Sequence, residues 1–186
     1  MSAVFRKVDD RLIYQGFVIG VHEVEFEGPG GEEMRRDVVR HPGAVSVVPL
    51  LDDGRVVLVR QFRAPMETEV LEIPAGKRDV EDEPPEITAS RELSEEVGYT
   101  ATEMVKLVSM CHSPGFCDEV NHIFLATGLV AGVRAVDGVE EEHMTIEYVQ
   151  LTDVFDLVAS GEIVDAKSIV GLTLAAQRLG VTPLPR

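Results

Sequence analysis

The chain has 186 residues and a net charge of −16, and apolar residues make up 45% of it. This length suits one sizeable domain, or one domain with a small appendage, and the composition is sufficient for a real core. The strong negative charge argues against a nucleic-acid backbone or an anionic membrane as the main partner. A ligand that contains phosphate would therefore need positive charge from another source.

Targeting and redox signals indicate a cytoplasmic protein. No apolar run is long enough to span a bilayer, and the first residues, MSAVFRKVDDR, lack the apolar stretch of a secretory signal. The two cysteines, Cys111 and Cys117, are six residues apart and have no further Cys to pair with. We therefore expect free thiols in a reducing compartment, with no membrane partner and no nucleic-acid partner.

Residues 1–42 are expected to form a small N-terminal antiparallel β domain. Extended, partly alternating segments lie on both sides of a Gly/Pro turn at Gly28–Gly31. A hairpin-like unit of this size buries little apolar surface by itself. It therefore needs a larger body or a partner chain.

Residues 43–186 are expected to form the main domain. The apolar runs AVSVVPLL and RVVLVRQF are separated by DDG, which predicts a hairpin. Mixed strands and helices indicate an α/β fold with a mixed sheet rather than a parallel βαβ array. The further expected strands are TEVLEIPAG, residues 104–110, residues 120–128 and MTIEYVQL, and the expected C-terminal helices are residues 152–160 and 164–179.

A further helix is predicted between Pro85 and Gly98. Proline suits the first turn of a helix, where a missing N–H costs nothing, and glycine suits the exit. Ala89, Leu93 and Val97 recur every four residues and can pack inward. This segment is therefore expected to bury one apolar face against the sheet.

The same helix carries a cluster of glutamates. Glu92 and Glu96 share a face, and Glu95 can pair with Arg91 four residues earlier. One interpretation is an ordinary solvated helix face. The other is a cation site, because clustered carboxylates repel until a divalent ion lies between them, and oxygen ligands suit Mg²⁺ or Mn²⁺. The excess of acids in residues 76–99, eight against three bases, favours the cation site.

The segment from Gly76 to Tyr99 resembles the signature of the Nudix hydrolases, G-x5-E-x7-R-E-U-x-E-E-x-G-U, where U is a bulky apolar residue. Every fixed position matches from Glu83 to Gly98, in RELSEEVG and the residues before it. One departure is that six residues, not five, separate Gly76 from Glu83. The insertion lies ahead of the helix, so it leaves the geometry of the helical carboxylates unchanged.

Beyond the signature, most of the chain resembles bacterial ADP-ribose pyrophosphatases, particularly the actinobacterial type. The resemblance is carried by VRQFRAP, LEIPAGKRDVEDEPPEITASREL, SPGFCDE and GEIVDAKSIVGL, and by Pro114, fifteen residues after Tyr99. This resemblance implies a Nudix α/β/α sandwich. It also implies that the N-terminal β domain crosses to the partner in a homodimer.

The resemblance also implies roles for individual residues. Glu92, Glu95, Glu96 and the backbone carbonyl of Ala75 would bind two or three Mg²⁺ ions, with Mn²⁺ as the alternative. Glu141, flanked by Glu140 and Glu142, would be the catalytic base on a loop, and Glu140 and Glu95, which lies beside the metals, are further candidate catalytic residues. The substrate-binding residues would be Arg36 and Asp37 from the partner chain, together with Arg63, Glu72, Gly115 and Phe116.

These roles agree with chemistry that can be argued independently. Divalent ions neutralise phosphoryl oxygens and lower the pKa of bound water, and a carboxylate can then accept the proton. The expected reaction is hydrolysis of ADP-ribose to AMP and ribose 5-phosphate. The alternatives are another nucleoside diphosphate derivative, such as GDP-mannose, another sugar nucleotide or NADH, and a non-catalytic ADP-ribose sensor. The spacing of His112 and His143 matches no zinc pattern.

Overall fold

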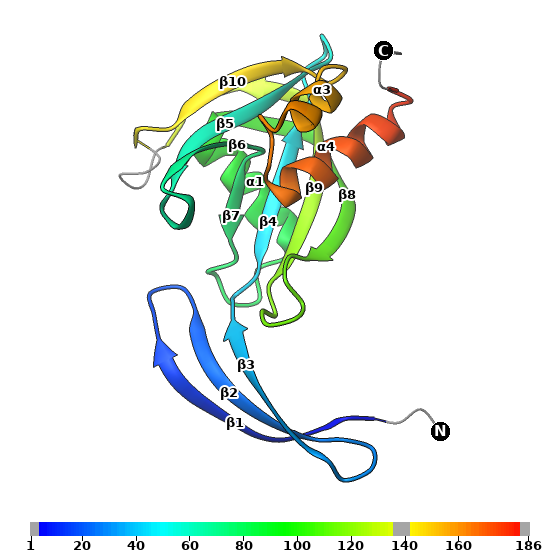
Figure 1. The fold of residues 1–186 in the computed structure, drawn as a ribbon. Coiled ribbons are helices and arrows are strands. Elements are labelled where there is room, and N and C mark those ends of the chain that lie inside the picture. Colours follow the sequence, from blue (N-terminus) through cyan, green and yellow to red (C-terminus); the bar gives the residue numbers. More distant parts are fainter. Residues whose placement is uncertain (1–3, 136–141, 183–186) are drawn as a thin grey trace. The chain divides into compact units, whose positions relative to one another are not determined.

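The computed structural model describes residues 4–135 and 142–182. The chain divides into two compact units. The first comprises Met1–Gly43 together with Cys111–Val120, and the second comprises Ala44–Met110 and Asn121–Arg186. Figure 1 shows the elements of both units. Each unit is described by itself below.

The first unit is built on a three-stranded antiparallel sheet in the order β1-β2-β3. Its strands are β1 (Arg6–Gln15), β2 (Gly20–Glu27) and β3 (Glu33–Arg40). Between β2 and β3, the amide of Gly28 donates to the carbonyl of Glu32 at 2.7 Å, and Gly31 has a φ of 86°. Glycine adopts this left-handed conformation without a steric penalty, so the predicted Gly/Pro turn closes here.

Residues 111–120 belong to the first unit, although they follow much of the second unit in sequence. The amide of Val39 donates to the carbonyl of Phe116 at 2.7 Å, and the amide of Asp118 donates to the carbonyl of Val39 at 3.1 Å. Arg40 forms an ion pair with Asp118 at 3.0 Å. From the sequence this segment was expected to belong to residues 43–186, and no local pattern connects it to β3.

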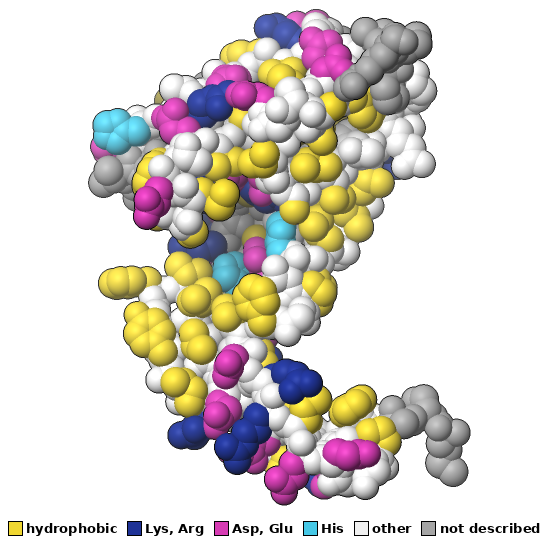
Figure 2. Space-filling view, viewed as in Figure 1, with side chains coloured by type: hydrophobic (Ala, Val, Ile, Leu, Met, Phe, Trp, Pro, Cys, Tyr) yellow, Lys and Arg dark blue, Asp and Glu magenta, His cyan; other side chains and the backbone are white. Residues whose placement is uncertain are grey.

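The first unit leaves many apolar side chains in contact with solvent. In Figure 2, hydrophobic side chains gather over the strands of this unit. Val24 is fully buried, whereas Phe17 is fully exposed. The other large exposed side chains of β1 and the β1–β2 turn are Val8, Leu12, Ile13, Tyr14 and Val18. A sheet of this size therefore buries little of its own apolar surface, as its sequence predicts.

The second unit contains two sheets, one in the order β7-β4-β9-β8 and the other in the order β10-β5-β6. β4 runs parallel to β9 and antiparallel to β7, so the four-stranded sheet is mixed, as predicted. The elements of this part of the chain are β4 (Ala44–Pro49), β5 (Arg55–Arg63), η1 (Ala64–Met66), β6 (Thr68–Glu72), β7 (Ala75–Lys77), α1 (Pro85–Val97), β8 (Tyr99–Cys111), β9 (Val120–Ala131), β10 (Thr145–Gln150), α3 (Val154–Ser160) and α4 (Ala166–Arg178).

The expected hairpin of β4 and β5 is only partly present. The DDG turn forms, with the amide of Gly54 donating to the carbonyl of Leu51 at 3.0 Å. The two strands then diverge into different sheets, and a single bridge between Leu50 and Val56 connects them. β4 pairs with β7 and β9 instead, while β5 pairs with β6 and β10. The prediction of a paired hairpin was therefore wrong beyond the turn.

Helices cover both faces of the mixed sheet. Val45 and Val47 of β4 belong to the same buried cluster as Leu93 of α1. Val48 belongs to a second buried cluster with Leu172 of α4. Because successive side chains of a strand point to opposite faces, α1 and α4 lie on opposite sides of β4 (Figure 1). This confirms the expected α/β/α sandwich.

Helix α4 packs very closely on the sheet at Gly171. A Cβ at this position would lie 3.0 Å from side-chain atoms of Ile73 and Ile123, and 3.1 Å from Val48. The absence of a side chain therefore brings the helix backbone close to β4 and β9. In the part of the chain that the structure describes, no helix is long and apolar enough to cross a membrane.

Candidate active site

Helix α1 is positioned as its sequence predicts. Pro84 is its N-cap residue, and Gly98 ends it with a φ of 72° while its amide donates to the carbonyls of Leu93 and Ser94. Ala89 and Leu93 are fully buried and hold the helix on the sheet. The neighbouring face then carries Glu92 and Glu96 against the backbone that follows β6.

Glu96 is anchored to this backbone by a direct hydrogen bond. The amide of Ala75 donates to Glu96 Oε2 at 2.9 Å, and only 4% of Glu96 is exposed. Ala75 is the first residue of β7, which pairs with the start of β4. The structure therefore brings together Glu96 and the residue whose carbonyl is expected to bind a metal.

Glu92 lies against the next residue of the same strand. It is 9% exposed, and a Cβ built on Gly76 would overlap its carboxyl group. Only glycine leaves room for the Glu92 carboxylate at this point, which accounts for a glycine beside the helix. The additional residue in the loop ahead of the helix therefore does not prevent Gly76 from reaching Glu92.

Glu95 lies on the more exposed side of the helix, beside Arg91. Arg91 Nη1 is 3.1 Å from both Glu92 Oε1 and Glu95 Oε2, and Arg91 Nη2 is 3.1 Å from Asp79. Burial alone would lower the pKa of Arg91, but the charges of Glu92, Glu95 and Asp79 outweigh it and raise the pKa. Arg91 is thus a structural cation that separates Glu92 from Glu95.

Glu83, the first glutamate of the family signature, supports the start of the helix. Thr88 Oγ1 donates to Glu83 Oε2 at 2.7 Å, and Arg78 donates to the Glu83 carbonyl at 2.9 Å. Glu83 therefore fixes the loop to the first turns of α1. This supporting role of Glu83 was not predicted from the sequence, although its fixed place in the signature was a signal that could have revealed it.

Arg63 is held by Glu72 across neighbouring strands. Its Nε and Nη2 donate to the two carboxylate oxygens of Glu72 at 2.8 and 2.6 Å. Glu72 is 2% exposed, whereas the side chain of Arg63 is 36% exposed. Glu72, expected to bind substrate, is therefore buried beneath Arg63, while Arg63 reaches the surface.

Lys167 is a second cation on Glu72, and the sequence analysis did not single it out. Its ammonium donates to Glu72 Oε2 and, at 2.9 Å, to Asp165 Oδ2. Burial alone would raise the pKa of Glu72, but hydrogen bonding to Arg63 and the charges of Lys167 and Arg63 outweigh it and hold the pKa below the ordinary value of a glutamate. The segment GEIVDAKSIVGL, part of the family likeness, was the only available signal.

Four of the expected substrate residues lie in the first unit. Arg36 and Asp37 are exposed neighbours on β3. Gly115 and Phe116 lie in the segment that packs on β3, and Phe116 is 56% exposed. Glu140 and Glu141, expected to act as catalytic residues, lie outside the described residues, while Glu142 is exposed.

The donor set around Ala75 suits a hard divalent ion. Within residues 4–135 and 142–182, no three Asp, Glu, His or Cys side chains are arranged to hold one. Two buried carboxylates, Glu92 and Glu96, do lie next to the backbone at Ala75. Mg²⁺ is commonly bound by one or two carboxylates, and water and substrate phosphates complete its coordination. The residues present therefore fit such an ion.

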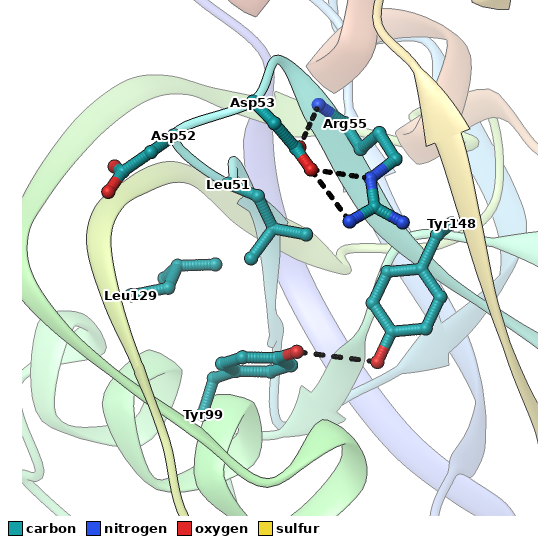
Figure 3. A pocket seen from close by; sticks show the side chains of 7 residues that line it. All are labelled: Leu51, Asp52, Asp53, Arg55, Tyr99, Leu129 and Tyr148. Atoms are coloured by element: carbon teal, nitrogen blue, oxygen red, sulfur yellow. Dashed lines mark hydrogen bonds and ion pairs between the residues drawn. The ribbon is translucent and has the colours of Figure 1, made fainter.

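A shallow hollow of about 470 Å³ lies elsewhere in the second unit, at the β4–β5 turn (Figure 3). Its polar groups are largely engaged with each other. Arg55 forms an ion pair with Asp53 at 2.6 Å, and the hydroxyls of Tyr99 and Tyr148 lie 3.3 Å apart. None of the predicted site residues lines this hollow, so we assign no function to it.

Comparison with known proteins agrees with this geometry. The family described as NUDIX domain matches residues 40–169. The chain is 43% identical to the ADP-ribose pyrophosphatase of Bacillus subtilis, and the alignment covers 84% of each chain. It is 36% identical both to the methanol dehydrogenase activator of Bacillus methanolicus, over 90% of each chain, and to the ADP-ribose pyrophosphatase of Mycobacterium tuberculosis, over 90% of this chain and 81% of that protein.

A solved structure supports the same fold. The crystal structure of an ADP compounds hydrolase aligns with a TM-score of 0.79 and 23% sequence identity, over 97% of this chain and 95% of the other. Enzymes of the Nudix family generally depend on divalent metal ions. The family match spans both the carboxylates of α1 and the backbone of β7 that they contact, and on these grounds the chain belongs to the Nudix hydrolases.

Proposed function

We propose that this chain hydrolyses the diphosphate bond of ADP-ribose, releasing AMP and ribose 5-phosphate. The observation that carries the proposal is the placement of Glu92 and Glu96, both buried, against the backbone of Gly76 and Ala75. The 43% identity to an ADP-ribose pyrophosphatase favours this substrate among those of the family.

The metal-binding residues of this proposal are Glu92, Glu96, the carbonyl of Ala75 and, at the edge of the site, Glu95. Two or three Mg²⁺ ions bound there, or Mn²⁺ ions, would neutralise phosphoryl oxygens and lower the pKa of a bound water. Glu96 is already oriented by the amide of Ala75, so little conformational freedom is lost when an ion binds. Arg63, whose guanidinium reaches the surface, is proposed to bind a phosphate oxygen of the substrate.

The proposed catalytic base is Glu141, with Glu140 next to it in sequence. A carboxylate at this place would accept the proton of the attacking water. Glu142 is the described residue that follows Glu140 and Glu141 in sequence, and it lies two residues before the buried Met144. A comparison of Glu140→Gln, Glu141→Gln and Glu142→Gln would identify the base. The base variant should lose the most in kcat, and the loss relative to wild type should shrink toward low pH, where the wild-type carboxylate is itself protonated.

The first unit is proposed to take part in the reaction through a homodimer. Its exposed apolar side chains need a partner, and Arg36 and Asp37 on its β3 would then reach the substrate of the other subunit. Phe116, whose carbonyl accepts from the amide of Val39, and its neighbour Gly115 are proposed to contact the same substrate. The proposed setting is cytoplasmic, with a small-molecule substrate and neither nucleic acid nor membrane as partner.

The test is a product screen with Mg²⁺ over ADP-ribose, GDP-mannose, another sugar nucleotide and NADH. Selective release of AMP and ribose 5-phosphate from ADP-ribose supports the proposal. Preferential cleavage of GDP-mannose or NADH would move the assignment to another nucleoside diphosphate derivative. Binding of ADP-ribose without turnover in the presence of Mg²⁺ would indicate a sensor.

A further inference from the structure

Glu72 is shared between two cations that come from distant parts of the chain. Arg63 reaches it from the end of β5, and Lys167 reaches it from the first turn of α4. Asp165 also binds Lys167. The side chains of Glu72 and Lys167 are 3% and 9% exposed, so water screens their charges only weakly.

The geometry of Arg63 directs one edge of its guanidinium away from Glu72. Both bonds to Glu72 use Nε and Nη2, so Glu72 leaves the Nη1 edge unused. A guanidinium held by two parallel bonds has little freedom to rotate. Glu72 therefore determines the direction in which Arg63 can meet a phosphate.

The net charge that a substrate meets at Arg63 depends on the charged side chains around it. Arg63 and Lys167 carry two positive charges, and Glu72 and Asp165 carry two negative charges, so the cluster is neutral. Without the charge of Lys167, the cluster would carry a net negative charge directly beneath Arg63. An anionic substrate would then meet a guanidinium whose charge is more than cancelled.

Helix α4 also fixes the segment between Glu72 and the metal-binding backbone. Asp165 is the N-cap of α4 and accepts hydrogen bonds from the amide and the hydroxyl of Ser168. Ser168 Oγ in turn accepts from the amide of Ile73 at 2.9 Å. The first turn of α4 thus contacts both the residue that holds Arg63 and the strand end that leads to Ala75.

From these contacts we propose that Lys167 is a positioning residue for the reaction. It neutralises Glu72 and Asp165, so that Arg63 keeps both its orientation and its positive charge for a phosphate of the substrate. This inference rests on the proposed function, because it assumes that Arg63 meets the diphosphate. Lys167 itself has no contact with the substrate in this account.

The test is a double-mutant cycle between Lys167→Met and Arg63→Met, with ADP-ribose and Mg²⁺. Loss of one well-oriented hydrogen bond between charged groups, here between Arg63 and a phosphate, weakens anion binding by about tenfold or more. We expect Lys167→Met to raise KM by about that factor, with kcat changed much less. In the Arg63→Met background the same substitution should raise KM by a clearly smaller factor, because the part of the effect that acts through the orientation of Arg63 is then absent.

Controls separate this effect from a loss of structure. Lys106→Met removes an exposed lysine from β8 and should leave KM unchanged. Lys167→Arg keeps the charge and should keep most of the wild-type KM. If Lys167→Met does not fold, Lys167→Gln replaces it, because it can still donate to Glu72 without the charge.

Two results would overturn the inference. One is an unchanged KM in a folded Lys167→Met or Lys167→Gln variant. The other is an equal rise of KM in the wild-type and Arg63→Met backgrounds, which would mean that Lys167 acts independently of Arg63. A wild-type protein that leaves ADP-ribose intact would instead refute the proposed function, so the two failures are distinguishable.

Discussion

Glu96 combines three properties that rarely occur together in a surface helix. It is a carboxylate, it is almost fully buried, and it accepts a hydrogen bond from the amide of Ala75. A buried carboxylate is costly unless it is paired or binds a metal. A divalent ion bound at this point would therefore stabilise both the side chain and the fold.

Glu96→Gln tests this role, because it replaces one carboxylate oxygen by an amide nitrogen and removes the negative charge. The amide oxygen can still accept from Ala75, so the fold should persist while the negative charge is lost. We expect kcat/KM to fall by about a hundredfold or more, which corresponds to about 2.7 kcal/mol of transition-state stabilisation. Glu69→Gln, at an exposed site of β6, is the matched control and should remain fully active. Similar kinetics for the two variants would contradict the assignment.

Gly76→Ala tests the close approach of Glu92. The new methyl group would overlap the Glu92 carboxylate, so the carboxylate must move away from the backbone of β7. We expect activity to fall at least tenfold while the midpoint of thermal unfolding changes little, since the displaced side chain can turn toward solvent. Gly132→Ala is the control, because its Cβ would make only an ordinary van der Waals contact, 3.5 Å from the carbonyl oxygen of Gly98.

The residues of the helix could be predicted because their signal is local. Pro84, Pro85 and Gly98 mark the ends, and the four-residue spacing of Glu92 and Glu96 places both on one face. The contact between Glu72 and Lys167 could not be predicted in this way. The two residues are 95 positions apart, and no periodicity links a strand end to the first turn of a distant helix.

At the level of elements, α4 is tied to the end of β6 through charged groups. Burial alone would raise the pKa of Asp165, but the charge of Lys167 and the hydrogen bonds from Ser168 outweigh it and lower the pKa below the ordinary value of an aspartate. A carboxylate with a lowered pKa in the folded state stabilises the fold fully above its unfolded pKa. That stabilisation is lost as the pH falls through the folded value.

With Asp165→Asn, the free energy of unfolding should therefore fall less steeply than in wild type as the pH is lowered. We expect the variant to be less stable than wild type at pH 6, by about 1–2 kcal/mol, with the difference shrinking toward pH 3. Urea unfolding at pH 6, 4 and 3 measures it. Asp52→Asn, at an exposed position in the β4–β5 turn, is the control and should follow the wild-type profile. A difference that stays constant with pH would contradict this account of Asp165.

The strands β4 and β5 could be predicted from the sequence, but their pairing partners could not. The continuous apolar, β-branched runs of β4 and β5 identify strands, and DDG identifies the turn between them. The sheet to which each strand belongs depends on longer-range pairing. β4 finds β9, more than seventy residues later, and β5 finds β10. A local turn signal carries no information about these partners.

At the level of the whole molecule, the two units differ in how well they bury their apolar residues. The second unit has two buried clusters around its sheets. The first has one fully buried valine and a run of exposed apolar side chains along β1. Burying such a surface against a second copy would supply a large hydrophobic contribution to association.

The double variant Tyr14→Glu/Phe17→Glu tests this at the level of assembly. Tyr14 is 62% exposed and Phe17 is fully exposed, so the monomer should tolerate both changes. We expect wild type to sediment as a dimer and the variant to dissociate at a protein concentration at least a hundredfold higher, with loss of activity. Val133→Glu changes an exposed apolar residue of the second unit and should remain dimeric. A monomeric, active wild type would refute the dimer.

Mg²⁺-dependent hydrolysis of ADP-ribose by this protein, and its dependence on Glu96, can be measured in one experiment. Purified wild-type protein and Glu96→Gln would be incubated with ADP-ribose with and without Mg²⁺, and the products separated by chromatography. The account predicts AMP and ribose 5-phosphate in equal amounts from wild type with Mg²⁺, and almost none in the other three samples. Undiminished hydrolysis by Glu96→Gln, or by wild type after removal of divalent ions, would contradict it.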